Sequence, residues 1–124
     1  MFAYFKSILE QDAAPIVICD LDSVIRYMNP AAVAEYHADL TGKNLFHCHK
    51  PGSVEKILRV LAWFRESKSH NCVFTSRIEK TDTDIYMIAL RDDSGDLIGY
   101  YEKHACRQRD TAPFYHFSSG NQAL

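Results

Sequence analysis

Hydrophobic residues recur along this chain with two different periods, and these periods predict its elements. The segment 2–11 has apolar residues at helical intervals: Phe2, Phe5, Ile8 and Leu9. A longer helix is predicted at 53–67, where the apolar residues form one stripe: Val54, Ile57, Leu58, Leu61 and Phe64. Ser53 suits the N-cap of this helix, because its hydroxyl can accept a hydrogen bond from a free backbone N–H.

Short β-prone runs lie on both sides of this long helix. Residues 15–20 and 24–28 are separated only by the turn Asp22-Ser23, which predicts an antiparallel hairpin. Three further strands are predicted after the helix: 71–80, 84–91 and 97–106. Strict alternation in the first of these three places four side chains on one face: Cys72, Phe74, Ser76 and Ile78.

The connection between the hairpin and the long helix contains helix signals. Asn29-Pro30 combines a favoured N-cap with a favoured first helical residue, so a short helix is expected through His37. A further helical turn is expected at 39–42, capped by Asp39 and ended by Gly42. Because strands and helices are segregated along the chain, the predicted fold class is α+β. We expect a five-stranded antiparallel sheet with helices on one face, and an additional N-terminal helix.

Composition and charge are those of an ordinary globular domain. The chain has 124 residues, of which 47% are hydrophobic and 24% charged, enough for one domain with a core. We expect an N-terminal helix at 1–13, a domain at 14–107 and a tail at 108–124. The net charge of −2 indicates no nucleic-acid partner, and no apolar run approaches the ~20 residues of a membrane span. Four cysteines without a CxxC pair, and no export signal, indicate reduced thiols in the cytoplasm.

Several short motifs follow one another in a characteristic order. They are Pro15-Ile16-Val17-Ile18-Cys19-Asp20, Tyr27-Met28-Asn29-Pro30-Ala31-Ala32, Leu40-Thr41-Gly42-Lys43-Asn44-Leu45 and Asp93-Ser94-Gly95-Asp96-Leu97-Ile98-Gly99. In this order and spacing, over about 14–106, they resemble a PAS domain, the small sensory module of bacterial signalling proteins. The resemblance implies a ligand pocket between the sheet and the long helix. Its implied wall residues are Ile57, Leu61, Phe74 and Ile88, with His47 and His49 as polar groups.

The segment before the long helix gives a finer resemblance. Residues 45–53 are similar to the Cys-His-x-Pro-x-Ser segment of a PAS subgroup from anaerobic and related bacteria. The matching residues are Cys48, His49, Pro51 and Ser53. Asn44 is followed by Leu45 instead of cysteine, so no flavin-adduct photoreceptor is expected. The last strand ends without the Asp-Ile-Thr-like motif that couples many PAS domains to a kinase.

The segment His47-Cys48-His49 is the strongest candidate for binding chemistry. Imidazole and thiolate are ligands for haem, iron and zinc, and His37 could join them as a fourth ligand. The alternative is structural: Cys48 packs inward, and the histidines bond the loop or the free N–H groups of the helix. His104 shares one side of the last strand with Glu102. If that side faces the helices, His104 lines the pocket; the charge of Glu102 favours the opposite, a polar or dimeric surface.

These observations leave two functional hypotheses. The first is a non-enzymatic sensory or regulatory module that binds a small ligand or a protein partner and passes on a shift in packing. The second is a haem- or metal-binding redox or gas sensor that uses His47, Cys48 and His49. An enzyme is not expected, because no pair of carboxylates or tyrosines is arranged for acid–base chemistry. The apolar face of the segment 2–11 needs a partner surface, which predicts a homodimer.

Overall fold

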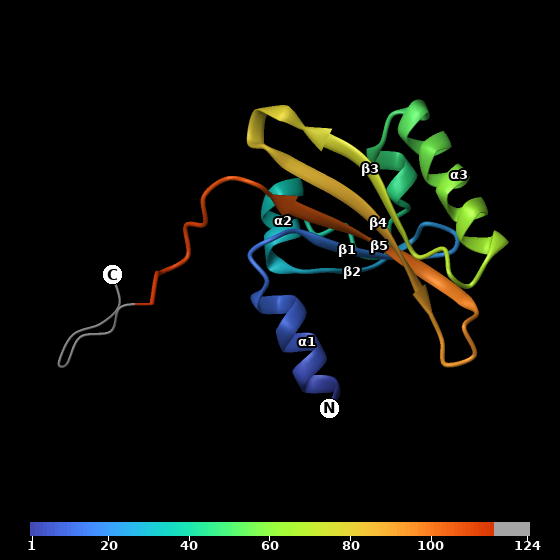
Figure 1. Cartoon of the computed structure of the whole chain (residues 1–124), viewed down its shortest axis with the longest axis horizontal. Helices are drawn as coiled ribbons and strands as arrows, with labels where there is room; N and C mark the ends of the chain where they lie inside the picture. Colours follow the sequence, from blue (N-terminus) through green and yellow to red (C-terminus); the bar gives the residue numbers. More distant parts are fainter. Residues whose placement is uncertain (116–124) are drawn as a thin grey trace.

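A five-stranded antiparallel sheet is the centre of the fold in the computed structural model, which describes residues 1–115 (Figure 1). The strands lie in the order β2-β1-β5-β4-β3, so β5 is central and pairs with β1 and β4. Their bounds are β1 Ile16–Asp20, β2 Ile25–Met28, β3 Cys72–Ile78, β4 Thr83–Arg91 and β5 Leu97–Cys106. The predicted α+β class and all five predicted strands are confirmed. Of the predicted tail, residues 116–124 lie outside the described residues.

Two helices cover one face of the sheet: α2 (Pro30–Tyr36) and α3 (Pro51–Glu66). The N-cap of α2 is Asn29, as predicted, with Pro30 in the first turn. Helix α3 begins at Pro51, earlier than predicted, and its N-cap position is occupied by Lys50 without a side-chain bond. Ser53 is therefore inside the first turn and is not the N-cap, because proline already fixes a helical φ at Pro51. No helix among residues 1–115 has the length and apolar character needed to cross a membrane.

The connection between α2 and α3 differs from the prediction at 39–42. These residues form a turn instead of a helical turn, closed by a 2.9 Å bond from Lys43 N to Leu40 O. Asp39 accepts hydrogen bonds from the N–H and hydroxyl of Thr41. Gly42 has φ of +89°, a left-handed conformation that glycine adopts without steric cost. A 3₁₀ helix, η1 (Leu45–Cys48), then leads into α3.

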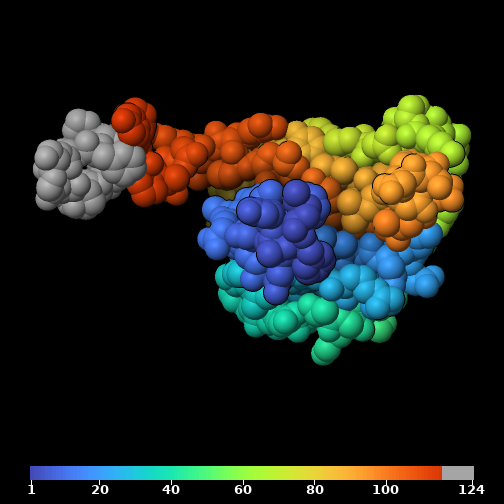
Figure 2. Space-filling model, turned by 90° about the horizontal axis from the view of Figure 1, so that it is seen from below, coloured from blue at the N-terminus to red at the C-terminus, as the bar shows by residue number. Residues whose placement is uncertain are grey.

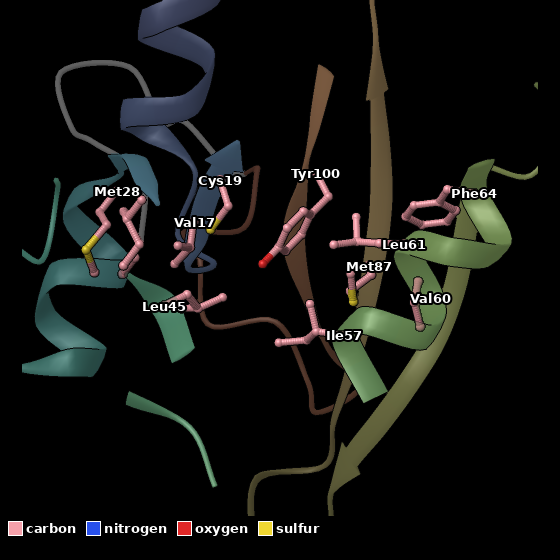
Figure 3. Close-up of a cluster of buried hydrophobic side chains, with 12 residues drawn as sticks. Val17, Cys19, Met28, Leu45, Ile57, Val60, Leu61, Phe64, Met87 and Tyr100 are labelled. Atoms are coloured by element: carbon pink, nitrogen blue, oxygen red, sulfur yellow. The ribbon is translucent and has the colours of Figure 1, made fainter. Parts of the chain in front are cut away.

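The hydrophobic core lies between the sheet and the elements α2, η1 and α3 (Figure 3). Helix α3 contributes four buried side chains: Ile57, Val60, Leu61 and Phe64. They face Tyr100 and Met87 of the sheet, which are 0% and 2% exposed. Leu58, predicted to lie in this stripe, is 51% exposed, because it follows Ile57 by one helical step and points away from the sheet.

A β-bulge in β3 changes which of its side chains face α3. Phe74 pairs with Tyr86 and Ser76 with Ile85, so Thr75 is the extra residue. The alternation therefore reverses across the bulge. Phe74 lies on the outer face, 58% exposed and 5.4 Å from the Tyr86 ring, whereas Ser76 faces the helices. The prediction that Cys72, Phe74, Ser76 and Ile78 share one face is therefore wrong.

Asn29 joins the amino-terminal segments to the sheet. Its side chain is fully buried, and its oxygen accepts hydrogen bonds from Ile16 N and Ala32 N, each at 2.9 Å. Its amide nitrogen donates to Leu9 O at 3.0 Å and to Ala14 O at 2.9 Å. One side chain thus fixes the end of helix α1 (Phe2–Gln11), the start of β1 and the start of α2. Helix α1 itself projects from the body of the domain (Figure 1), lies in front of it when seen from below (Figure 2), and has no buried residue.

Replacing Asn29 with alanine should destabilise the protein by about 3 kcal/mol, because it removes an N-cap and leaves several buried backbone groups unpaired. Urea unfolding followed by circular dichroism measures this change. The matched control is Asn44→Ala, which removes a cap at the surface, where water can replace the lost bonds to Phe46 N and Asp22 O. The control should lose about 1 kcal/mol or less. Equal losses in the two variants would contradict the central position of Asn29.

Candidate functional site

A cavity of about 270 Å³ lies between α2, α3 and the sheet. Its apolar lining includes Ile57 of α3 with Ile85 and Met87 of β4. Most of the remaining lining is polar and comes from several segments of the chain. It includes Tyr36 of α2, His49 before α3, Lys56 of α3, and Glu102 and His104 of β5. Polar groups that converge beside apolar side chains can orient a small molecule.

The last strand places Glu102 and His104 in this cavity by simple alternation. Tyr100, two residues earlier on the same side, is fully buried, and its hydroxyl lies 2.8 Å from Ser23 Oγ. The side of β5 that contains His104 therefore faces the helices, which is the first of the two predicted alternatives. The expectation that the charge of Glu102 would turn this side outward is wrong. Glu102 is 8% exposed and lies beside a histidine.

His49 and Glu102 form an ion pair inside the cavity that is too long to be a hydrogen bond. The distance from His49 Nε2 to Glu102 Oε1 is 3.7 Å, and both side chains are largely buried. Interaction with the Glu102 carboxylate raises the pKa of His49, although burial of the ring acts in the opposite direction. Burial lowers the pKa of His104, which favours its neutral form despite the nearby carboxylates. The pKa values of the two histidines in one cavity are thus shifted in opposite directions.

Tyr36 completes the polar side of the cavity. Burial raises the pKa of its hydroxyl, and the charge of Glu102 raises it further. Tyr36 therefore remains a neutral phenol that can donate or accept a hydrogen bond.

The structure does not bring His47, Cys48 and His49 together. His49 alone of the three lines the cavity, whereas His47 and Cys48 are exposed. The physical reason is the 3₁₀ helix η1, in which successive side chains point about 120° apart. His37, the suggested fourth ligand, is exposed at the end of α2. Within residues 1–115 no three His, Cys, Asp or Glu side chains could hold a metal ion, so this segment does not fit a metal site.

The predicted wall residues divide into two groups. Ile57 lines the cavity as expected, and Leu61 lies beside it in the core, 1% exposed. Phe74 and Ile88 lie on the opposite face of the sheet and do not line the cavity. Ile88 faces outward because successive residues of a strand alternate and its neighbour Met87 faces inward. Phe74 faces outward because it precedes the bulge, where the alternation of β3 has not yet reversed.

Sequence reasoning missed most of the lining residues, among them Tyr36, Ile85, Met87 and Glu102. A signal for Glu102 was nevertheless present in the chain. It stands between Tyr100 and His104 at a position where alternation requires an inward side chain, and a carboxylate at such a position is unusual. No local signal indicates its partner His49, which is distant in sequence.

Comparisons with known proteins agree with this geometry. Residues 5–104 match the family model described as PAS domain. No curated protein sequence matches this chain. A C-terminal domain from Streptococcus mutans is similar in structure, with a TM-score of 0.68, 20% identity and coverage of 85% of this chain and 84% of that chain.

Two further solved structures are PAS domains. One, from Colwellia psychrerythraea, has a TM-score of 0.65 at 13% identity and covers 85% of this chain and 95% of that chain. The other, from BvgS of Bordetella pertussis, has a TM-score of 0.63 at 14% identity and covers 87% of each chain. At these identities the similarity establishes the fold and leaves the ligand open.

Replacing Glu102 with glutamine should lower the pKa of His49 from above 6.5 to below it, because burial then acts without the carboxylate. In the wild type, protonated His49 stabilises the native state below pH 6.5, and this contribution is lost as the pH rises through the raised value. A histidine-selective NMR titration measures both forms. In the same spectra the pKa of His104 should stay below 6.5 in both the wild type and Glu102→Gln, which provides an internal control. An unchanged His49 pKa in Glu102→Gln would contradict the pairing.

Proposed function

Because this chain belongs to the PAS domain family, whose members are generally non-catalytic sensory modules in signal transduction, we propose that it senses a small ligand. The ligand occupies the cavity between α3 and the sheet. One observation supports this most directly: the cavity places apolar side chains of α3 and β4 together with the buried carboxylate of Glu102. The free state of all four cysteines supports a reducing compartment such as the cytoplasm.

Strand β5 is the proposed route from the ligand to the rest of the protein. Glu102 and His104 face the cavity on one side of the strand. Tyr101 and Lys103, on the other side, line a groove of about 550 Å³ that also includes Ile8 and Leu9 of α1. A ligand that shifts β5 therefore changes the surface beside α1. Such a shift of population between two packings is how a binding event reaches a distant surface.

Helix α1 is the proposed output surface and dimer contact. Its apolar side chains Phe2, Phe5 and Ile8 are 80%, 57% and 67% exposed. A contiguous apolar surface of this kind is typical of a protein–protein contact. A helix of 10 residues is also marginal without tertiary packing, which a second copy of the chain would supply.

We do not extend the proposal to a haem or metal sensor. Two of the three expected ligands, His47 and Cys48, are exposed, and the third, His49, is engaged with Glu102. The cavity volume of about 270 Å³ also suits a small ligand. An absorption spectrum of the purified protein tests this part: a strong visible band would restore the haem hypothesis.

Filling the cavity should abolish ligand binding. In Ile57→Phe the larger side chain enters the cavity, whereas Leu58→Phe, the matched control, places the same ring on the exposed side of α3. A filtered extract of small metabolites should shift the amide NMR signals of cavity residues in the wild type and in Leu58→Phe, but not in Ile57→Phe. Overpacking should lower the stability of Ile57→Phe by ~1–3 kcal/mol, so unfolding curves accompany the spectra. An extract that shifts no cavity signal in the wild type would overturn the proposed function.

Introducing charge on α1 should convert a dimer into a monomer. We expect Phe5→Glu and Ile8→Glu to give the monomer mass by size exclusion with light scattering, while the wild type gives the dimer. Leu58→Glu, an equally exposed apolar residue on α3, should remain dimeric. The fold of each protomer should change little in stability, within about 0.5 kcal/mol, because both α1 side chains are exposed within it. A wild type that stays monomeric at all concentrations would refute this contact.

A further inference from the structure

The carboxylate of Glu102 is buried while one of its oxygens lacks a hydrogen bond. Glu102 is 8% exposed, and its Oε1 has no hydrogen-bonding partner among residues 1–115. The imidazole of His49 compensates its charge, but Nε2 lies 3.7 Å away, beyond hydrogen-bonding distance. A buried anionic oxygen without a donor is costly, so a donor is expected to approach it from the cavity.

Other polar side chains of the cavity are also available to a ligand. Neither the hydroxyl of Tyr36 nor the ring of His104 makes a side-chain hydrogen bond within the part of the chain that the structure describes, and both lie within the field of Glu102. Glu35 adds a second carboxylate to the cavity lining. Lys56 and protonated His49 add positive charge to the lining, and the Nζ of Lys56 already donates to Thr75 O at 2.9 Å.

We propose that this cavity binds a small organic cation with N–H donors, an ammonium or amidinium group on a short apolar body. This inference rests on the proposed ligand-binding function and names the class of the ligand. The N–H groups donate to Glu102, and the apolar body lies along Ile57, Ile85 and Met87. His49 offsets the charge of Glu102 but leaves its Oε1 without a donor, and a carboxylate or phosphate ligand would supply none and would add a like charge beside that oxygen. The volume of about 270 Å³ lies just below the usual range of small-molecule pockets, so it suits a small ligand.

Two sets of probes with matched shapes test the sign of the ligand charge. Benzamidine, benzamide and benzoate form one set, and butylamine, butanol and butyrate form the other. Amide NMR titrations of the full chain should show that at least one cation shifts the signals of Ile85 and Met87. We expect its affinity to exceed that of its neutral counterpart at least tenfold, and the anions should leave these signals unchanged.

Variants locate the selectivity at Glu102. Glu102→Gln keeps the shape of the side chain and removes its charge, so it should weaken cation binding at least tenfold and leave neutral probes unaffected. Glu66→Gln, at the exposed end of α3, is the matched control and should bind as the wild type does. If Glu102→Gln does not fold, the affinities of the wild type for the cationic, neutral and anionic probe of each set still decide whether the cavity prefers a cation.

The outcomes separate this inference from the function on which it rests. Neutral or anionic probes that bind as tightly as the cations would overturn the ligand class and leave the sensory function standing. The same holds if no probe binds but the metabolite extract still shifts the cavity signals. If neither probes nor extract reach the cavity, both proposals fail, and an ordered water is the donor to Glu102.

Discussion

The amide of Asn29 is the polar group on which the amino-terminal half of this fold depends. It uses both its donors and its acceptor on backbone groups, and it is fully buried. Backbone N–H and C=O groups are hydrogen-bonded to water in the unfolded chain, so each one that is buried on folding needs a partner within the protein. Asn29 provides these partners where α1 ends and where β1 and α2 begin. The regular hydrogen bonds of helices and sheets do not supply them at these ends. A second contact, a hydrogen bond from the Tyr27 hydroxyl to Glu10, holds α1 near β2, the strand that pairs with β1.

Much of this arrangement was readable from the sequence because its causes are local or periodic. Asn29-Pro30 predicted the start of α2 from capping preferences, and Ile57, Leu61 and Phe64 predicted the buried stripe of α3 from helical spacing. The strands followed from alternation and turn residues. The bonds from Asn29 to Leu9 and Ala14 were not readable, because they depend on where the folded chain brings distant backbone groups.

The errors have equally specific causes. Alternation fails at Thr75 because one inserted residue reverses the side on which Phe74 and Ser76 lie, and no residue type marks the bulge. The side chains of His47, Cys48 and His49 do not converge as expected, because a 3₁₀ helix spreads three consecutive side chains around its axis. The orientation of β5 was misjudged because the burial of Glu102 depends on His49, which only the tertiary structure places beside it. In each case local sequence was sufficient to find the segment and insufficient to orient its side chains.

Glu102 is a charged residue at a strand position where the pattern of the sequence calls for an apolar one. At a core-facing position of a central strand, an apolar side chain would pack on Met87 and stabilise the sheet, whereas a carboxylate must be desolvated. His49 offsets part of this cost, but at 3.7 Å it supplies charge without a hydrogen bond. Folding physics alone does not favour such a group, and sites that break a local rule are expected where a protein binds or reacts. Glu102 lines the cavity on one side of β5, while the neighbouring Tyr101 faces α1 on the other. Glu102, which lowers the stability of the fold, thus lies where a bound ligand could offset this loss and shift β5 against α1.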